Sequence, residues 1–136
     1  MDPEDSSIPD DMVDLLTSDI VATVAAHRRD GSIALYQMWI DYDGEHILAN
    51  SAVGSIKARN WERDPRVTLS VVDRSDPWRF LVIRGTVLER RPDAGLEHID
   101  RVSQRYVGGP YRRRHLAREI FVIEPENVQA RRGRGS

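Results

Sequence analysis

The residues whose types and spacing suggest chemistry lie between Ser51 and Val72, where cations and amides precede an apolar run. The first half of this stretch predicts a short helix, which ends at Asp64-Pro65 because proline disfavours helical geometry in the residue before it. N–H groups in the first turn of a helix lack partners within the helix, and the helix dipole favours negative charge there. The segment therefore predicts a site for a phosphate-bearing cofactor, with four candidate side chains: Ser55, Lys57, Arg59 and Asn60.

Other kinds of catalytic site have little support in the residue types. The chain has no cysteine, so disulfides, thiolate nucleophiles and thiolate metal sites are excluded. Its histidines are scattered: His27 and His46 adjoin turns, His98 lies in a helical segment, and His115 lies in an arginine-rich one. The carboxylates are mostly at turns and chain ends. We therefore expect no metal site and no acid–base pair, and we assign no catalytic residue.

The pattern of apolar residues predicts a scaffold built mainly from strands. Asp30-Gly31 and Asp43-Gly44 predict tight turns, since glycine after aspartate readily adopts a positive φ. Helical spacing predicts one helix over 9–17 and another over 93–106, with Asp93 as its N-cap. Hairpin order with helices between and after the strands favours a small antiparallel barrel. About six strands are predicted, at 20–26, 33–42, 46–49, 67–72, 80–89 and 119–123, the last resuming at Val128.

Composition limits the classes of protein to which the chain can belong. With 136 residues, 40% of them hydrophobic and 31% charged, we expect a single domain over 1–136 with flexible ends at 1–8 and 131–136. No apolar run is long enough to cross a bilayer, and the acidic first residues do not form a secretory signal, so we expect no membrane partner and a cytoplasmic location. A formal net charge of −2 argues against nucleic acid as a partner, although Arg112–Arg114 and Arg131–Arg134 are locally basic.

Four short motifs follow one another along the chain. They are Ala-Thr-Val at 22–24 with Asp30-Gly31, Lys-Ala-Arg-Asn at 57–60 with Arg-Asp-Pro-Arg-Val at 63–67, Ile-Arg-Gly-Thr-Val at 83–87, and Arg-Tyr-Val-Gly-Gly-Pro-Tyr at 105–111. Their order and spacing resemble the flavin-binding superfamily named for pyridoxamine 5′-phosphate oxidase, and within it the branch that binds the deazaflavin F420. The resemblance covers nearly the whole chain and implies a split β-barrel, mainly β with short helices.

This resemblance implies a homodimer that holds two cofactors in grooves between the subunits. It implies that Lys57 and Asn60 contact the cofactor phosphate, with Arg59 as a helper. Some relatives carry a basic residue where this chain has Ser55, which removes one cation from the phosphate site. The arginines at Arg112–Arg114 could compensate if their loop reaches the groove.

The remainder of the cofactor is expected to lie against residues of two strands and one turn. The resemblance implies that Met38 and Trp39 edge the ring and that Trp78 closes the ring site from the partner subunit. Trp61, beside the phosphate helix, is expected to pack in the core instead. The ribityl chain is expected to lie along three consecutive residues: Ala49, Asn50 and Ser51.

The expected activity is hydride transfer from reduced F420 to a small organic acceptor. In such reactions the cofactor carries the difficult chemistry, and the protein supplies position, electrostatics and exclusion of water. Two alternatives stay open within the same fold: an FMN-dependent oxidase or reductase, and a non-catalytic carrier of flavin or F420.

Overall fold

The computed structural model describes residues 5–135, and within them seven strands form one sheet in the order β2-β1-β5-β6-β7-β4-β3. All paired strands are antiparallel. The expected mainly β architecture with short helices is confirmed, with seven strands where about six were predicted. The strands are β1 (Ala22–His27), β2 (Ile33–Met38), β3 (Asp41–Tyr42), β4 (Ile47–Ala52), β5 (Arg66–Val72), β6 (Arg79–Pro92) and β7 (Arg118–Arg132).

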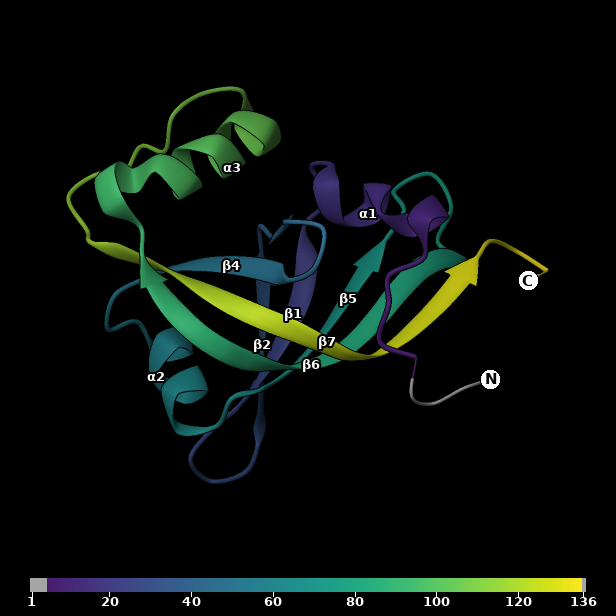
Figure 1. The fold of residues 1–136 in the computed structure, drawn as a ribbon, viewed down its shortest axis with the longest axis horizontal. Coiled ribbons are helices and arrows are strands. Elements are labelled where there is room, and N and C mark those ends of the chain that lie inside the picture. The colour runs from purple at the N-terminus through teal and green to yellow at the C-terminus, as the bar shows by residue number, and fades with distance from the viewer. Residues whose placement is uncertain (1–4, 136) are drawn as a thin grey trace.

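In the described residues, short helices lie before the first strand and between later strands. Two are 3-10 helices, η1 (Asp10–Met12) and η2 (Ala94–Leu96), and three are α-helices, α1 (Asp14–Thr17), α2 (Ile56–Arg63) and α3 (Glu97–Val107). In Figure 1, β4 lies between α3 on one side and α2 on the other. None of the helices in the described part of the chain combines the length and the apolar character needed to cross a membrane.

The seventh strand arises because the strand predicted over 33–42 is two strands. β2 and β3 are separated only by Trp39 and Ile40, yet they form the opposite edges of the sheet. Two residues span only about 7 Å of extended chain, so the sheet must curl until its two edges approach each other. The curl produces a barrel that is split at the Trp39–Ile40 connection.

Side chains from α3 form hydrogen bonds with the backbone N–H and carbonyl groups at this split. The Ile40 N–H donates to the Tyr106 hydroxyl at 3.2 Å, and that hydroxyl donates to the Ile20 carbonyl at 2.7 Å. The Arg105 guanidinium donates to the Ile40 carbonyl and, at 3.1 Å, to the Ser18 carbonyl. Buried backbone groups are costly when they lack partners, so these bonds allow the sheet edges to diverge without loss of stability.

β6 and β7 form a long antiparallel pair, and η2 and α3 lie in the segment that connects them. α2 and the start of β7 lie at one end of this pair, and the C-terminal end of β7 lies at the other (Figure 1). β7 is continuous, whereas the sequence predicted a strand over 119–123 that resumes at Val128. The structure also assigns Arg131 and Arg132 to β7, although a flexible end was predicted over 131–136. Of the ends predicted to be flexible, 1–4 and 136 lie outside the described residues.

The apolar core fills the interior of the curled sheet. Met12, Leu15 and Leu16 are buried there, as the amphipathic pattern of the first helical segment predicts. Trp61 is 1% exposed and packs against Phe121 with 4.9 Å between ring centroids. The prediction that Trp61 packs in the core is therefore confirmed, and α2 is anchored to the barrel by this contact.

Candidate functional site

A cavity of about 200 Å³ lies where β4, the split of the barrel, α2, α3 and the start of β7 meet. It combines two half-buried cations with aromatic and apolar side chains. Four of the site residues predicted from the sequence line it together: Met38, Trp39, Asn50 and Lys57. The other lining residues are Gln37, Ile40, Leu48, His98, Ile99, Val102, Tyr111 and Arg118.

The neighbours of Asn50 on β4 face away from this cavity. Side chains of a strand alternate between its two faces, so Leu48 and Asn50 line the cavity while Ala49 and Ser51 point to the other side. Both Ala49 and Ser51 are 0% exposed. The Ser51 hydroxyl shares a 2.7 Å hydrogen bond with the Ser55 hydroxyl. Contacts of Ala49 and Ser51 with a ribityl chain stay predictions.

Asn60 is the predicted phosphate contact that the structure places elsewhere. Its side chain is buried, its amide nitrogen donates to the Tyr36 hydroxyl at 3.2 Å, and its amide oxygen accepts from Arg63 at 2.7 Å. The bond to Tyr36 ties α2 to β2. Neither Asn60 nor the exposed Arg59 lines the cavity, and their contacts with a phosphate stay predictions.

Trp78 precedes β6, at the end of the β6–β7 pair that is farther from the cavity. β6 begins at Arg79 opposite Arg132 and ends near the start of β7, so about 40 Å of strand separates the two regions. Trp78 is 46% exposed, and the Arg131 guanidinium lies over its ring at 5.2 Å from the centroid. Trp78 therefore does not reach the cavity of its own chain, and its closing of a ring site in a partner subunit stays a prediction.

Lys57 is positioned by the first turn of α2. The Ser55 hydroxyl caps this helix by accepting from the Ala58 N–H at 3.1 Å, which satisfies one of the unpaired N–H groups of the helix entrance. The Lys57 ammonium lies 5.6 Å from the centroid of the Tyr36 ring. Burial lowers the pKa of Lys57, and the nearby charge of Arg118 lowers it further.

Arg118 is the second cation of the cavity, and the sequence did not single it out. Its Nε donates to the Asn50 amide oxygen at 2.6 Å and its Nη1 donates to the Tyr111 hydroxyl at 3.2 Å. The guanidinium also lies over the Tyr111 ring, 4.7 Å from the centroid. Burial lowers the pKa of Arg118 from its usual value. No described carboxylate lies within ion-pair distance of Lys57 or Arg118.

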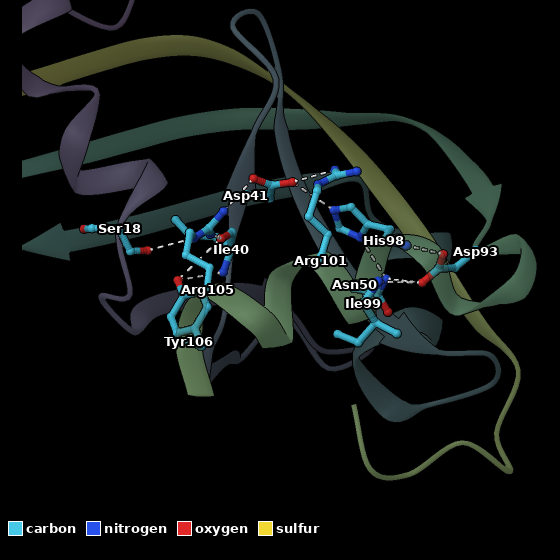
Figure 2. A network of polar contacts seen from close by, with 10 residues as sticks. All are labelled: Ser18, Ile40, Asp41, Asn50, Asp93, His98, Ile99, Arg101, Arg105 and Tyr106. Atoms are coloured by element: carbon cyan, nitrogen blue, oxygen red, sulfur yellow. Dashed lines mark hydrogen bonds and ion pairs between the residues drawn. The ribbon is translucent and has the colours of Figure 1, made fainter. Parts of the chain in front are cut away.

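A buried polar network forms one wall of the cavity (Figure 2). The Asn50 amide nitrogen donates to Asp93 Oδ2 and to His98 Nδ1, both at 2.9 Å. Because His98 Nδ1 accepts a hydrogen bond, the ring proton is assigned to Nε2, which donates to Asp41 Oδ2 at 3.1 Å. The Asp41–His98 contact is a buried hydrogen bond between β3 and α3, and no local spacing in the sequence indicated it.

Asp41 also accepts hydrogen bonds from two arginines of α3. Arg105 donates to Asp41 Oδ1 at 2.9 Å and Arg101 to Oδ2 at 3.1 Å. Burial acts to raise the pKa of Asp41, but the hydrogen bonds from His98, Arg105 and Arg101 outweigh it and hold the pKa well below its usual range. Asp41 therefore stays an anion in the folded protein and fixes α3 against the start of β3.

The helix predicted over 93–106 with Asp93 as its N-cap begins later: α3 starts at Glu97 with Leu96 as its N-cap residue, because the 3-10 helix η2 comes between. Asp93 still binds the first turn of α3 through its side chain. Its carboxylate accepts from the N–H groups of His98 and Ile99, each at 2.9 Å. This contact fixes the start of α3, and with it the position of the His98 ring on the cavity. A capping signal was thus the one local sequence feature that pointed to this wall of the site.

A second cavity of about 580 Å³ adjoins the first, and Trp39 and Tyr111 line both. Trp39 stacks on Tyr106 with 5.2 Å between centroids and meets Tyr111 edge-on at 6.2 Å. Arg112 and Arg113 line this second cavity, whereas Arg114 pairs with Asp100 at 2.6 Å. The three arginines considered as compensation for Ser55 therefore lie outside the first cavity.

Comparisons with known proteins agree with this architecture. The family model described as pyridoxamine 5′-phosphate oxidase matches residues 8–132. Among solved structures, an F420 reductase is similar with a TM-score of 0.83 and 28% identity over 90% of this chain and 98% of its own. A conserved hypothetical protein from Mycobacterium tuberculosis has a TM-score of 0.75 and 25% identity over 96% of this chain and 88% of its own.

A more distant structure shares the fold alone. It is a putative pyridoxamine 5′-phosphate oxidase from Listeria innocua, with a TM-score of 0.66 and 18% identity over 89% of this chain and 95% of its own. A search of the curated proteins finds no match.

Proposed function

This chain belongs to the pyridoxamine 5′-phosphate oxidase family, and we propose that it is an oxidoreductase that binds F420 at the cavity of Lys57 and Trp39. The superfamily and the F420 branch expected from the sequence motifs are confirmed. The observation that carries the proposal is the cavity itself, where a half-buried cation without a carboxylate partner lies beside aromatic rings. This combination fits a ligand that joins a phosphate to a flat ring.

The residues of the chain have separate tasks in this proposal. Lys57 binds the phosphate through its ammonium group. Met38 and Trp39 offer an apolar surface to the ring and exclude water from it. When bound, the reduced cofactor supplies a hydride, and the acceptor is a small organic molecule. The adjoining cavity, which shares Trp39 with the first, is the place for that acceptor.

We include a homodimer in the proposal because a single chain offers only part of a cofactor site. Pockets that enclose drug-sized ligands measure roughly 300 to 1,000 Å³, whereas this cavity measures about 200 Å³. A second copy could complete the groove and bring Trp78 to the ring. Exposed apolar side chains on the edge strand β2, Ile33 at 48% and Leu35 at 65%, support burial against another chain.

One observation favours FMN as the alternative cofactor. Ser55 occupies a position where a basic residue would strengthen the hold on a longer, polyanionic tail, and its hydroxyl is engaged in capping α2. A single phosphate, as in FMN, needs less positive charge. The structural similarity to an F420 reductase at 28% identity favours F420.

Fluorescence titration of the purified protein with F420 and, in parallel, with FMN tests the proposal. We expect saturable, tight binding of F420 and weaker binding of FMN. The opposite preference would assign the protein to the FMN alternative, and micromolar binding of neither would contradict the proposed function. Tight binding without reduction of any acceptor in a broad panel would identify a carrier.

A further inference from the structure

Two cations face the same cavity, and the proposed function uses only one of them. We propose that Lys57 and Arg118 form a two-cation clamp for one phosphate group, in which Arg118 supplies the positive charge that position 55 lacks. The clamp depends on the proposed function only for the identity of the molecule that carries the phosphate. Phosphate recognition by these two residues can be tested without that molecule.

Arg118 lies beside the segment that leads into α2. Arg118 pairs with Ala52 at the end of β4, and the Val53 N–H donates to the Ala117 carbonyl at 2.9 Å. These backbone contacts hold the start of β7 beside the segment that leads into α2. A cation on β7 therefore reaches the same region as a cation at position 55, while Ser55 remains available to cap the helix.

The Arg118 guanidinium is held in one orientation by its neighbours. Nε is held by Asn50 and Nη1 by Tyr111, while the guanidinium face lies on the Tyr111 ring. Within residues 5–135 no hydrogen bond involves Nη2. An arginine held in this way retains little freedom for a ligand to restrict, and its planar guanidinium suits a phosphate.

Both cations are partly withdrawn from water. Burial lowers the pKa of Lys57 and the pKa of Arg118, and the charge of Arg118 lowers the pKa of Lys57 further. Asp93 is the carboxylate whose charge acts on Arg118, but its oxygens already accept from Asn50, His98 and Ile99. Two desolvated cations without an ion-pair partner favour an anion between them.

Asn50 acts in this clamp as a positioning residue. Its amide oxygen accepts from Arg118, and its amide nitrogen is taken by Asp93 and His98. Both its amide oxygen and its amide nitrogen therefore bond within the protein and hold Arg118 in place. The contact with a ribityl chain that the sequence suggested for Asn50 stays a prediction.

The test measures phosphate binding with and without Arg118. Inorganic phosphate and acetate are titrated into wild type, Arg118→Gln and Arg118→Met, and tryptophan fluorescence is followed because Trp39 lines the cavity. Arg84→Gln is the matched control, since Arg84 is exposed on β6 and lines no described cavity. In parallel, FMN and riboflavin, which differ by the phosphate, are titrated into the same four proteins.

We expect the Arg118 variants to bind inorganic phosphate about 10- to 100-fold more weakly, the effect of losing a hydrogen-bonded charge. FMN binding should weaken in proportion while riboflavin binding stays unchanged, and Arg84→Gln should behave as wild type. Arg118→Met keeps an unbranched apolar side chain against Tyr111. If Arg118→Gln does not fold, the phosphate affinity of Arg118→Met provides the test.

Three outcomes would overturn the clamp. The first is equal phosphate affinity in wild type and the Arg118 variants, and the second is no saturable phosphate binding by wild type. The third is a preference for acetate over phosphate, because the anion would then be a carboxylate. If phosphate binds through Arg118 but F420 and FMN do not bind at all, the clamp stands and the proposed function fails.

Discussion

Asp41 and His98 are 57 residues apart in the sequence, and in the folded chain Asp41 Oδ2 accepts a 3.1 Å hydrogen bond from His98 Nε2. Both side chains are nearly inaccessible to solvent. Asp41 begins β3 at one edge of the split barrel and His98 lies in the first turn of α3. Their contact joins the helix to the sheet at the wall of the candidate site.

Asp41→Asn should destabilise the protein by about 3 kcal/mol, because it removes one partner of a buried ionic network and leaves Arg105 without its carboxylate. Arg101 contributes little to this figure, since its side chain is 66% exposed. Urea unfolding followed by circular dichroism measures the change. Asp10→Asn, at an exposed carboxylate, is the control and should stay within about 0.5 kcal/mol of wild type. Equal stabilities of Asp41→Asn and wild type would show that the network does not stabilise the fold.

The unfolding free energies of wild type and Asp41→Asn should depend differently on pH. The pKa of Asp41 is lower in the folded than in the unfolded chain, so its contribution is complete above the unfolded pKa of about 4 and is lost as the pH falls below it. The gap in unfolding free energy between wild type and Asp41→Asn should therefore narrow as the pH is lowered from 6 toward about 3. A gap that does not change with pH would contradict the low pKa of Asp41.

Lys57→Ala should weaken binding of the phosphate-bearing cofactor by about 1 to 3 kcal/mol, the scale of losing a hydrogen bond to a charged group. The fold should persist, because alanine is a strong helix former and the Lys57 side chain makes no ion pair within the described residues. Cofactor titration gives the affinity, and Arg84→Ala provides a control for the loss of one positive charge. An unchanged dissociation constant would place the phosphate elsewhere.

Trp78→Ala should lower cofactor affinity or turnover while leaving the fold intact. Trp78 is 46% exposed and contacts Arg131, so its removal costs the chain roughly 0.5 to 1 kcal/mol. Because Trp78 lies far from the cavity of its own chain, any effect on binding requires a second copy. Cofactor titration and urea unfolding are measured on the same preparation. Loss of the folded state would identify Trp78 as a core residue, and unchanged binding would remove it from the site.

Gly85→Ala should destabilise the protein by at least about 2 kcal/mol, because overpacking forces the backbone to move. A Cβ at Gly85 would lie 2.2 Å from the Glu124 carbonyl oxygen, at the β-bulge where β6 shifts its register against β7. Gly109→Ala is the matched control, since a Cβ there meets no atom within 4 Å. Thermal unfolding of both variants compares the two positions, and similar melting temperatures would contradict the close approach at Gly85.

Local features of the fold were predictable because short-range chemistry determines them. The Asp30-Gly31 turn joins β1 and β2 as its composition indicates, and α2 ends before Pro65. The amphipathic residues of α1 are buried. Asp93 bonds to the first turn of α3, although that helix begins at Glu97, four residues later than predicted. The division of 33–42 into two strands was missed because the alternation of side chains continues through Trp39 and Ile40 without a turn signal.

Part of the candidate site was also within reach of the sequence. Lys57 and Asn50 were singled out, and both line the cavity together with Met38 and Trp39. The Asn60 amide bonds to Tyr36 and Arg63, which no pattern within α2 reveals, and its contact with a phosphate stays a prediction.

The sequence by itself determined which segments become strands, turns and helices, because the period of apolar residues and the conformations of glycine and proline act over a few residues. Only the tertiary structure decided that Arg118 would stand beside Lys57. Arg118 reaches Asn50 across 68 residues because β7 pairs with β4, and the partner and register of a strand depend on the burial of the whole sheet. The cations of the site are therefore brought together by long-range strand pairing, for which a single sequence carries no local signal.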